Sequence, residues 1–314
     1  MLCRGEFVIV LLVTGGTGLV GHALQKIYPD AVYIGSRDYD LTKEEDVKKM
    51  FQRFKPDRVI HLAAKVGGIK ANMMYPADFI YQNIMMNTLV VHYAYKYDVK
   101  KLIGVLSNCA YPDVAKSYPL TEDQLYDGPP QSTNFSYAYA KRALGVQIQS
   151  YRKQYGCNFF CVIPCNLYGP YDNFDETESH FLAALIRKIY EAKVNKTKEI
   201  KLLGTGKPLR QYLYSEDLAQ ILLVLLEKYD GVEPINIAPR ENPSIEEIAE
   251  TALKVIGCSD CKIVFDKTFP DGQFRKDLSI ERLLKVIGDF RFTPLPVGVK
   301  KTYRWYLKNV VKTV

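Results

Sequence analysis

Short apolar runs alternate with longer amphipathic stretches over the first half of the chain. The runs are rich in β-branched and aromatic residues, as buried strands are, and the stretches between them have the apolar spacing of helices. This alternation is typical of a parallel sheet with crossover helices. We predict strands at Phe7 to Val13, Ala31 to Ile34, Arg58 to His61, Lys101 to Leu106 and Phe159 to Ile163, and helices at Gly18 to Ile27, Lys43 to Phe54, Pro76 to Tyr97 and Phe135 to Tyr155.

The pattern changes after Pro164, where prolines, glycines and aromatic residues crowd positions 164–174 and the later segments become shorter. Ser215 is expected to cap one helix of this part, and Ser244 with Glu247 forms the pattern of a capping box. Helices are predicted at about His180 to Lys193, Ser215 to Glu227 and Ser244 to Val255, and a short strand at Pro234 to Ile237 that returns to the main sheet.

The predicted fold class is therefore α/β, with two parts. A Rossmann-type doubly wound parallel sheet occupies residues 1–165 and binds NADP, with a returning segment at about 211–240. A smaller, discontinuous α/β lobe occupies residues 166–210 and 241–314 and binds the substrate. The helices Pro76 to Tyr97 and Phe135 to Tyr155 are long and apolar on more than one face, so we expect a homodimer in which they form a bundle.

Composition limits the classes of partner. A chain of 314 residues with 47% hydrophobic and 25% charged residues is typical of a folded globular protein. The net charge of +7 is spread without a basic tract, so no nucleic-acid partner is expected. The longest apolar run, Phe7 to Val13, is far shorter than the roughly 18 residues of a membrane span. The N-terminal stretch has only Arg4 as a basic residue and no cleavage site, so we expect a cytoplasmic protein.

The seven cysteines, an odd number scattered along the chain, suggest reduced thiols rather than a disulfide framework. Cys258 and Cys261 form one Cys-x-x-Cys pair, which lacks the second pair or the nearby histidines that a structural zinc site needs. No metal is expected. The four histidines are His22, His61, His92 and His180.

A glycine-rich turn, Thr14 to Gly21, follows the first predicted strand and opens the first helix. Glycines there let backbone N–H groups and the helix N-terminus approach a pyrophosphate, so the turn indicates a dinucleotide site. At the end of the second strand, Ser36 and Arg37 suit a 2′-phosphate and favour NADP over NAD, although Asp38 or Asp40 could still reach a ribose. The expected contacts are Gly15, Gly16, Thr17, Gly18, Leu19, Val20, Gly21 and Arg37.

Tyr137 and Lys141 are four residues apart near the start of a predicted helix, so their side chains point the same way. The ammonium is expected to lower the pKa of the phenol. The same spacing occurs twice elsewhere, but only this pair follows Ser107 at the carboxyl edge of the sheet. We expect Ser107 to bond a carbonyl oxygen, Tyr137 to exchange its proton, and Lys141 to hold the ribose.

At these residues the chain resembles the extended short-chain dehydrogenase/reductase family, and in particular the branch that makes GDP-L-fucose. The resemblance extends over nearly the whole chain. It is carried by Thr14 to Gly21, His61 to Ile69, Tyr75 to Asn83, Ser107 to Pro112, Tyr137 to Lys141, Asn166 to Phe174, Arg210 to Asp217 and Asp271 to Lys276.

The resemblance implies 3,5-epimerisation of GDP-4-keto-6-deoxy-D-mannose followed by reduction at C4 with NADPH. It also implies Cys109 as a base and His180 as an acid, whereas without it a cysteine after a buried strand is more often packing, as we read Cys157, Cys161 and Cys165. The cofactor contacts that it implies are Ser107, Lys141, Pro164, Asn166, Leu167 and His180, and the substrate contacts are Asn166, Lys188, Leu203, Arg210 and Asp271.

Two substrate positions depart from the family pattern. Lys188 stands where some members have Arg, so it cannot form the two parallel hydrogen bonds of a guanidinium. Leu203 stands where bacterial members have a Trp, and it cannot stack on a guanine. Two alternatives remain: another nucleotide-sugar 4-epimerase or 4,6-dehydratase, or a non-catalytic dinucleotide-binding regulator. A dehydratase would need a carboxylate beside Ser107, where the chain has Asn108.

Overall fold

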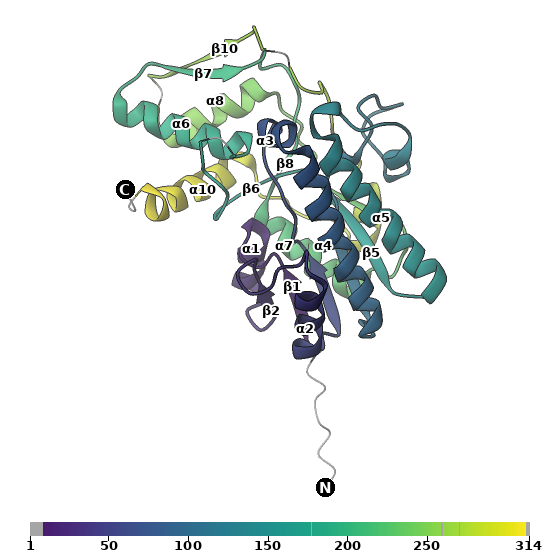
Figure 1. Cartoon of the computed structure of the whole chain (residues 1–314). Helices are drawn as coiled ribbons and strands as arrows, with labels where there is room; N and C mark the ends of the chain where they lie inside the picture. Colours follow the sequence, from purple (N-terminus) through teal and green to yellow (C-terminus); the bar gives the residue numbers. More distant parts are fainter. Residues whose placement is uncertain (1–8, 177, 259, 270, 312–314) are drawn as a thin grey trace.

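The computed structural model describes residues 9–176, 178–258, 260–269 and 271–311, which form two lobes (Figure 1). The lower lobe is built on a six-stranded sheet of order β2-β1-β3-β4-β5-β9, in which every neighbouring pair is parallel. Its strands are β1 Leu11–Thr14, β2 Val32–Ile34, β3 Arg58–His61, β4 Lys101–Val105, β5 Phe159–Pro164 and β9 Ile235–Ile237.

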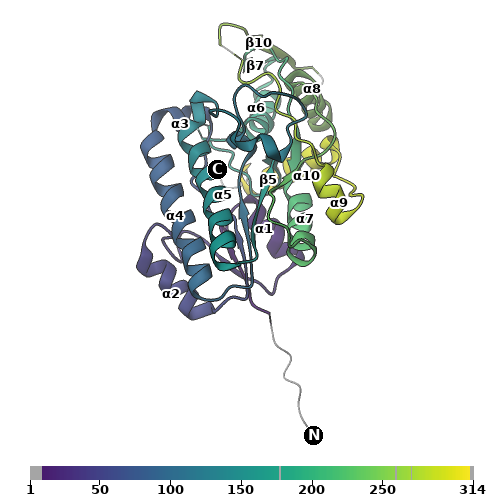
Figure 2. The ribbon, with the colours of Figure 1, turned by 90° about the vertical axis from the view of Figure 1, so that its right-hand side faces the viewer.

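Helices cover both faces of this sheet, which is why β1, β4 and β5 are buried along their whole length. Figure 2 shows the sheet nearly edge-on between the two layers of helices. One layer contains α1 Leu19–Ile27 and α7 Ser215–Lys228, and the other contains α2 Glu44–Phe54, α4 Pro76–Lys96 and α5 Phe135–Tyr155.

The upper lobe has an apolar core of its own. It contains α6 Phe181–Asn195, α8 Ile245–Ile256, α10 Leu295–Asn309 and the parallel pair β7 Glu199–Leu203 and β10 Lys262–Asp266. A second parallel pair, β6 Asn166–Tyr168 and β8 Tyr212–Tyr214, lies where the lobes meet (Figure 1). The short helix α3 Ile69–Met74 precedes α4, and α9 Glu281–Ile287 packs against α7 and β9, so it joins the lower core although it lies in the range expected for the upper lobe.

The sheet and its order confirm the predicted α/β class. β3 and α5 have the predicted bounds, and the strand at 235–237 returns to the sheet beside β5. The first strand is displaced, since β1 begins at Leu11, while Phe7 and Val8 lie outside the described residues. The pairs β6–β8 and β7–β10, with α3 and α9, were not predicted because these elements are short and carry little periodicity. The helix α10 was also missed, although it has 15 residues and an amphipathic pattern.

Of the two predicted caps, one is confirmed and one is wrong. The backbone N–H of Glu247 donates to Ser244 Oγ at 3.1 Å, and that of Ser244 donates to Glu247 Oε2 at 2.7 Å. Ser215 is instead the first residue of α7, because β8 runs into the helix without a loop and Tyr214 takes the capping position. The buried Ser215 side chain packs against Gly169.

The expectation of reduced thiols is wrong at one pair, since Cys258 and Cys261 form a disulfide with their Cα atoms 5.6 Å apart. The end of α8 and the start of β10 bring the two together, which a count of cysteines does not reveal. Cys109, Cys157, Cys161 and Cys165 are free thiols. Within the described ranges, no three His, Cys, Asp or Glu side chains are grouped as metal ligands. Across the same ranges, no helix is long and apolar enough to cross a membrane.

Candidate active site

The carboxyl ends of β1 and β3 mark the point where the strand order reverses, which is where ligands of open α/β sheets bind. Thr14 Oγ1 lies 2.7 Å from His61 Nδ1, and His61 Nε2 lies 3.0 Å from Asn87 Oδ1. Burial, and then the charge of Lys141, lower the pKa of His61 to about 3. A neutral imidazole therefore connects the two strand ends to α4.

In the glycine-rich segment that joins β1 to α1, close packing leaves no space for a Cβ at Gly15, Gly16 or Gly21. Gly15 has a φ of +71°, and a Cβ there would lie 2.8 Å from the backbone nitrogen of Ala63. A Cβ on Gly21 would lie 2.3 Å from the carbonyl oxygen of Gly16. The N-cap of α1 is Gly18, which has no side chain to occupy the helix N-terminus. The residues thus fit a pyrophosphate approaching the backbone N–H groups.

The end of β2 presents a guanidinium while its neighbouring carboxylates bond the backbone. Asp38 Oδ2 accepts the N–H of Gly35 at 2.7 Å. Asp40 Oδ1 accepts the N–H and the hydroxyl of Thr42 at 3.0 and 2.6 Å. Arg37 is exposed. This arrangement favours a 2′-phosphate over a ribose hydroxyl as the group bound here.

Ser107 and Cys109 lie just after β4, where a single 3-10 turn, η1 Asn108–Ala110, begins. Ser107 is its N-cap, and its Oγ accepts the N–H of Cys109 at 3.2 Å. Tyr137, on the first turn of α5, interacts with both residues. Burial and the charge of Cys109 raise the pKa of Tyr137, and a hydrogen bond with Ser107 partly opposes this rise.

Lys141 lies one turn further along α5 and is only 2% exposed. Its Nζ donates to the carbonyl oxygen of Val105 at 2.7 Å and lies 5.7 Å from the ring centre of Tyr137. Burial lowers the pKa of Lys141 to about 8. The expectation that Lys141 lowers the pKa of Tyr137 is not met, because the phenol is buried and the ammonium is turned toward Val105.

His180 is the N-cap of α6 in the upper lobe, and desolvation by the surrounding protein lowers its pKa. Its neighbour Ser179 reaches the lower lobe, since a Cβ on Gly68 would lie 3.5 Å from the Ser179 carbonyl oxygen. Over the described residues, no hydrogen bond or ion pair links His180 to Cys109 or Tyr137. The predicted acid therefore lies on the opposite lobe from the other four residues.

The predicted nucleotide contacts line the upper lobe. The Arg210 guanidinium donates to the Leu209 carbonyl at 2.7 Å, and burial lowers its pKa. Asp271 accepts the N–H of Thr205 at 2.7 Å and its hydroxyl at 2.6 Å, so it holds the loop after β7. The charges of Arg210 and Asp271 also act on each other.

The other predicted contacts are spread more widely. Lys188 donates to the Lys201 carbonyl at 3.0 Å in an open groove between α6 and β7, and the side chain of Leu203 is 63% exposed at the end of β7. Asn166 donates to the carbonyl of Gln211, just before β8, at 2.9 Å. Pro164 ends β5, and Leu167 lies in the middle of β6.

Lys276 was not assigned to the catalytic group by sequence reasoning. Its Nζ lies 3.9 Å from Cys109 Sγ, and the residue is 8% exposed. The two residues are 167 positions apart. No local pattern around Lys276 predicts this contact, because it depends on how the chain after β10 folds back onto the loop beyond Cys109.

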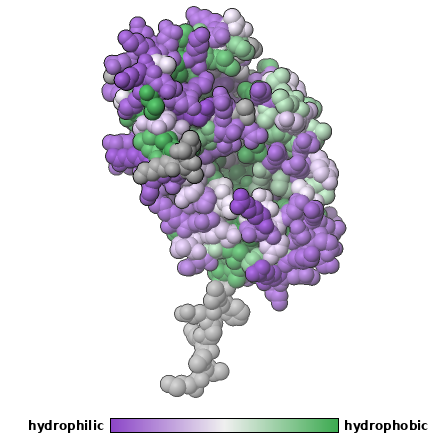
Figure 3. All heavy atoms as spheres, turned by 60° about the vertical axis from the view of Figure 1, so that its left-hand side comes forward, coloured by the Kyte–Doolittle hydropathy of each residue, from purple (hydrophilic) through white to green (hydrophobic). Residues whose placement is uncertain are grey.

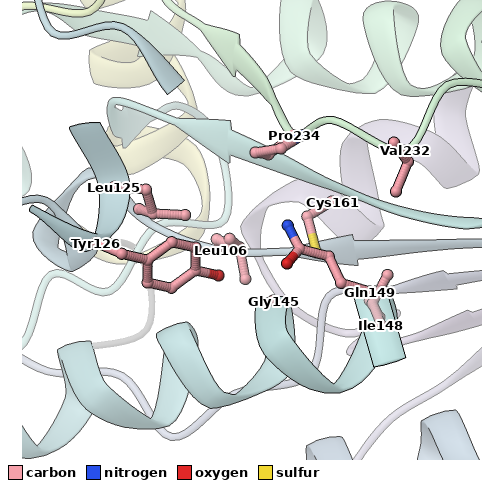
Figure 4. A pocket seen from close by; sticks show the side chains of 9 residues that line it. All are labelled: Leu106, Leu125, Tyr126, Gly145, Ile148, Gln149, Cys161, Val232 and Pro234. Atoms are coloured by element: carbon pink, nitrogen blue, oxygen red, sulfur yellow. The ribbon is translucent and has the colours of Figure 1, made fainter. Parts of the chain in front are cut away.

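A small cavity lies between α5 and β5, behind the candidate site (Figure 4). Leu125 and Tyr126 line one side and Cys161 another, as the close-up shows. Burial raises the pKa of the Cys161 thiol to about 12. Cys161, which is buried and lines this mainly apolar cavity, is therefore a packing residue. The surface of the molecule is more polar than the lining of this cavity. In Figure 3 the upper lobe is largely hydrophilic, and apolar side chains gather where the lobes meet.

Comparisons with known proteins extend over both lobes. The model of the NAD dependent epimerase/dehydratase family matches residues 11–238. A GDP-L-fucose synthase of Sinorhizobium fredii is 43% identical over 303 residues, which cover 95% of each chain. GDP-L-fucose synthase 1 of Arabidopsis thaliana is 42% identical over 305 residues, covering 96% of this chain and 94% of the relative. The crystal structure of a GDP-L-fucose synthetase from Naegleria fowleri bound to NADP has a TM-score of 0.90 at 38% identity, covering 97% of this chain and 94% of that one.

Proposed function

The chain belongs to the NAD dependent epimerase/dehydratase family, and on this basis we propose that it is an NADP-dependent GDP-L-fucose synthase. It epimerises C3 and C5 of GDP-4-keto-6-deoxy-D-mannose and reduces C4. The observation that carries the proposal is that Ser107, at the carboxyl edge of the sheet, hydrogen-bonds both the backbone of Cys109 and the phenol of Tyr137, whose pKa the charge of Cys109 also raises. A plain reductase needs no thiol in this group, whereas an epimerase needs a base beside the ketone.

NADP(H) is the cofactor, and when bound it supplies the hydride that reaches C4. The N-terminus of α1 and the glycine turn suit its pyrophosphate. Arg37, which is exposed at the end of β2, is the proposed partner of the 2′-phosphate, and Lys141 is assigned to the ribose. The remaining contacts that we assign to the cofactor are Ser107, Pro164, Asn166, Leu167 and His180.

Cys109 and His180 are the proposed epimerisation pair. The C4 ketone acidifies the hydrogens at C3 and C5, so the Cys109 thiolate can remove each proton and the electron pair moves onto the C4 oxygen. His180 then returns a proton from the opposite face. Its position on the other lobe supports this role, because inversion needs the acid and the base on different faces of the sugar.

Ser107 and Tyr137 serve both steps. The two hydroxyls can donate to the C4 oxygen, stabilising the enolate in epimerisation and the alkoxide in reduction. Since burial raises the pKa of Tyr137, its phenol remains protonated at neutral pH and can supply the proton that completes reduction.

The GDP moiety is assigned to the upper lobe. Arg210 is the proposed partner of the diphosphate, and Asp271, which holds the loop at Thr205, shapes the site beside it. Lys188 and Leu203 extend the site toward the base, and Asn166 contacts the substrate near the cofactor. Lys188 provides a positive charge without the two-pronged hydrogen bonding of an arginine, and Leu203 provides apolar contact without stacking an aromatic ring on the base.

A homodimer formed through α4 and α5 is part of the proposal. These helices pack against each other and expose apolar side chains, including Tyr81, Tyr139 and Val146, whose exposed fractions are 62%, 40% and 51%. A bundle of α4 and α5 from two copies would cover them. A cytoplasmic location is also part of the proposal: Cys109, Cys157, Cys161 and Cys165 are free thiols, although Cys258 and Cys261 form a disulfide.

One assay tests the function. GDP-4-keto-6-deoxy-D-mannose and NADPH are supplied together, the loss of NADPH absorbance is followed, and the product is examined by NMR. We expect NADPH consumption and GDP-L-fucose, and no NADPH consumption would refute the proposal. In deuterated water, Cys109→Ser should stop deuterium entry at C3 and C5 while NADPH affinity stays unchanged.

A further inference from the structure

The ammonium of Lys276 faces the sulfur of Cys109 at the site. Nζ and Sγ are 3.9 Å apart. Among the described residues, the Cys109 thiol is the hydrogen-bond partner of the Lys276 ammonium. Lys276 is 8% exposed, so the ammonium is largely removed from water. A cation about 4 to 6 Å from a thiol favours the thiolate, and screening by solvent is weak for buried pairs.

The segment that carries Lys276 is tied to the loop beyond Cys109. Gln273 Nε2 donates to the Asp113 carbonyl at 2.8 Å. The N–H of Leu120 donates to the Asp277 carbonyl at 2.7 Å, and that of Ser279 donates back to Leu120 at 2.8 Å. Bonds on both sides of Lys276 thus hold its backbone beside the active site.

The neighbouring cations have other partners. Arg275 forms a two-pronged pair with the carboxylate of Asp277 and lies over the ring of Tyr118, 5.2 Å from its centre. The Arg210 guanidinium donates to the Leu209 carbonyl, although its charge also acts on Cys109. Lys276 is therefore the cation whose hydrogen-bonding group points at the sulfur.

We propose that Lys276 is a positioning residue that holds Cys109 as a thiolate and so activates it as the epimerisation base, which rests on the proposed function. In that step the C–H bond beside the ketone breaks, its electron pair moves onto the C4 oxygen, and the proton forms the S–H bond. Lys276 takes no part in the proton transfer itself. Among the described residues, the charge of Cys109 also acts on Arg210 and on the Tyr137 phenol, and the Ser107 hydroxyl oxygen accepts the backbone N–H of Cys109.

The test measures thiol reactivity without substrate. Alkylation of Cys109 by iodoacetamide is followed by mass spectrometry of its peptide, in the full-length protein, at pH 7 and at pH 10. We expect Lys276→Met to react about tenfold more slowly at pH 7 and at the wild-type rate at pH 10, where any exposed thiol is ionised. Lys276→Arg keeps the charge and should react within about twofold of wild type at both.

Lys267→Met, an exposed lysine on the same lobe, is the matched control and should leave both rates unchanged. Equal alkylation rates for wild type and Lys276→Met at pH 7 would overturn the proposal. Alkylation of Lys276→Met that is slowed equally at pH 7 and pH 10 would also overturn it, because it would indicate that the reagent reaches Cys109 less easily. Thermal unfolding of each variant verifies that it is folded. Deuterium entry at C3 and C5 should slow about tenfold in Lys276→Met and recover in Lys276→Arg. Alkylation needs no substrate, so it tests the role of Lys276 independently of the NADPH assay that tests the proposed function.

Discussion

The hydroxyl oxygen of Thr14 lies 2.7 Å from Nδ1 of His61, at the carboxyl ends of two neighbouring strands. The imidazole also bonds Asn87 on α4, so one side chain links the start of the glycine turn, the sheet and a covering helix. Such a buried imidazole must be neutral for this arrangement to be favourable. The pair thus makes the cofactor end of the site sensitive to acid.

Acid should destabilise the fold through His61. The unfolded imidazole takes a proton near pH 6.5, whereas the folded one takes it only at about pH 3. Between these values the unfolded state binds more protons, so stability falls as pH falls, by about 2 kcal/mol between pH 6.5 and pH 5. His61→Gln should lose this component of the pH dependence of unfolding by urea. His92→Gln controls for removal of a histidine, and an unchanged slope in His61→Gln would contradict the assignment.

Gly21→Ala should weaken cofactor binding. The new Cβ would lie 2.3 Å from the Gly16 carbonyl oxygen, so the turn must shift. We expect the Kd for NADPH, measured by fluorescence titration, to rise at least about tenfold. In Gly18→Ala the nearest atom, the Gly15 carbonyl oxygen, is 3.4 Å away, so the turn itself should be preserved. A Gly21→Ala protein that binds NADPH like wild type would contradict the close-packing argument.

Arg37→Ala should change the choice of cofactor. Loss of a charge-assisted contact of about 1.5 to 3 kcal/mol corresponds to roughly 10- to 100-fold weaker NADPH binding. NADH affinity should stay the same, because NADH has no 2′-phosphate. Arg53→Ala, another exposed arginine, is the control, and calorimetric titration gives both constants. The same NADPH to NADH ratio in Arg37→Ala and wild type would remove Arg37 from this role.

Tyr137→Phe should abolish most of the reduction and leave NADPH binding intact. Removing a positioned proton donor costs about 100- to 10,000-fold in kcat. Tyr139→Phe, two residues along the same helix and 40% exposed, should retain its rate. Steady-state loss of NADPH absorbance measures both variants. Comparable rates for the two would show that another group delivers the proton.

Val146→Glu should convert a dimer into monomers. Val146 is 51% exposed on α5, in the proposed bundle, where a carboxylate would be buried without a partner. Val194→Glu places the same charge on α6, where the valine is 58% exposed, and should not change the mass. Light scattering after size exclusion distinguishes the species. A wild-type monomer, or a dimer that persists in Val146→Glu, would contradict the proposed interface.

Local signals in the sequence predicted much of the lower lobe. Burial on both faces produces apolar runs, and a strand that enters a helix through glycines has a recognisable turn, so β3, α5 and the Gly15 to Gly21 segment were predictable from neighbouring residues. Ser244 was equally local, since its capping bonds span three positions. The short strands of the upper lobe were not predicted, because which of their residues are buried depends on partners that are distant in the chain.

The sequence by itself determined the parallel α/β fold, the dinucleotide turn and the order of Ser107, Tyr137 and Lys141 along the chain. The tertiary structure alone decided what surrounds them: a buried phenol whose pKa is raised rather than lowered, the Cys258–Cys261 disulfide, and Lys276 beside Cys109. The physical reason is that propensity and periodicity act over a few residues. Desolvation and charge act through space, between atoms that only the folded chain brings together.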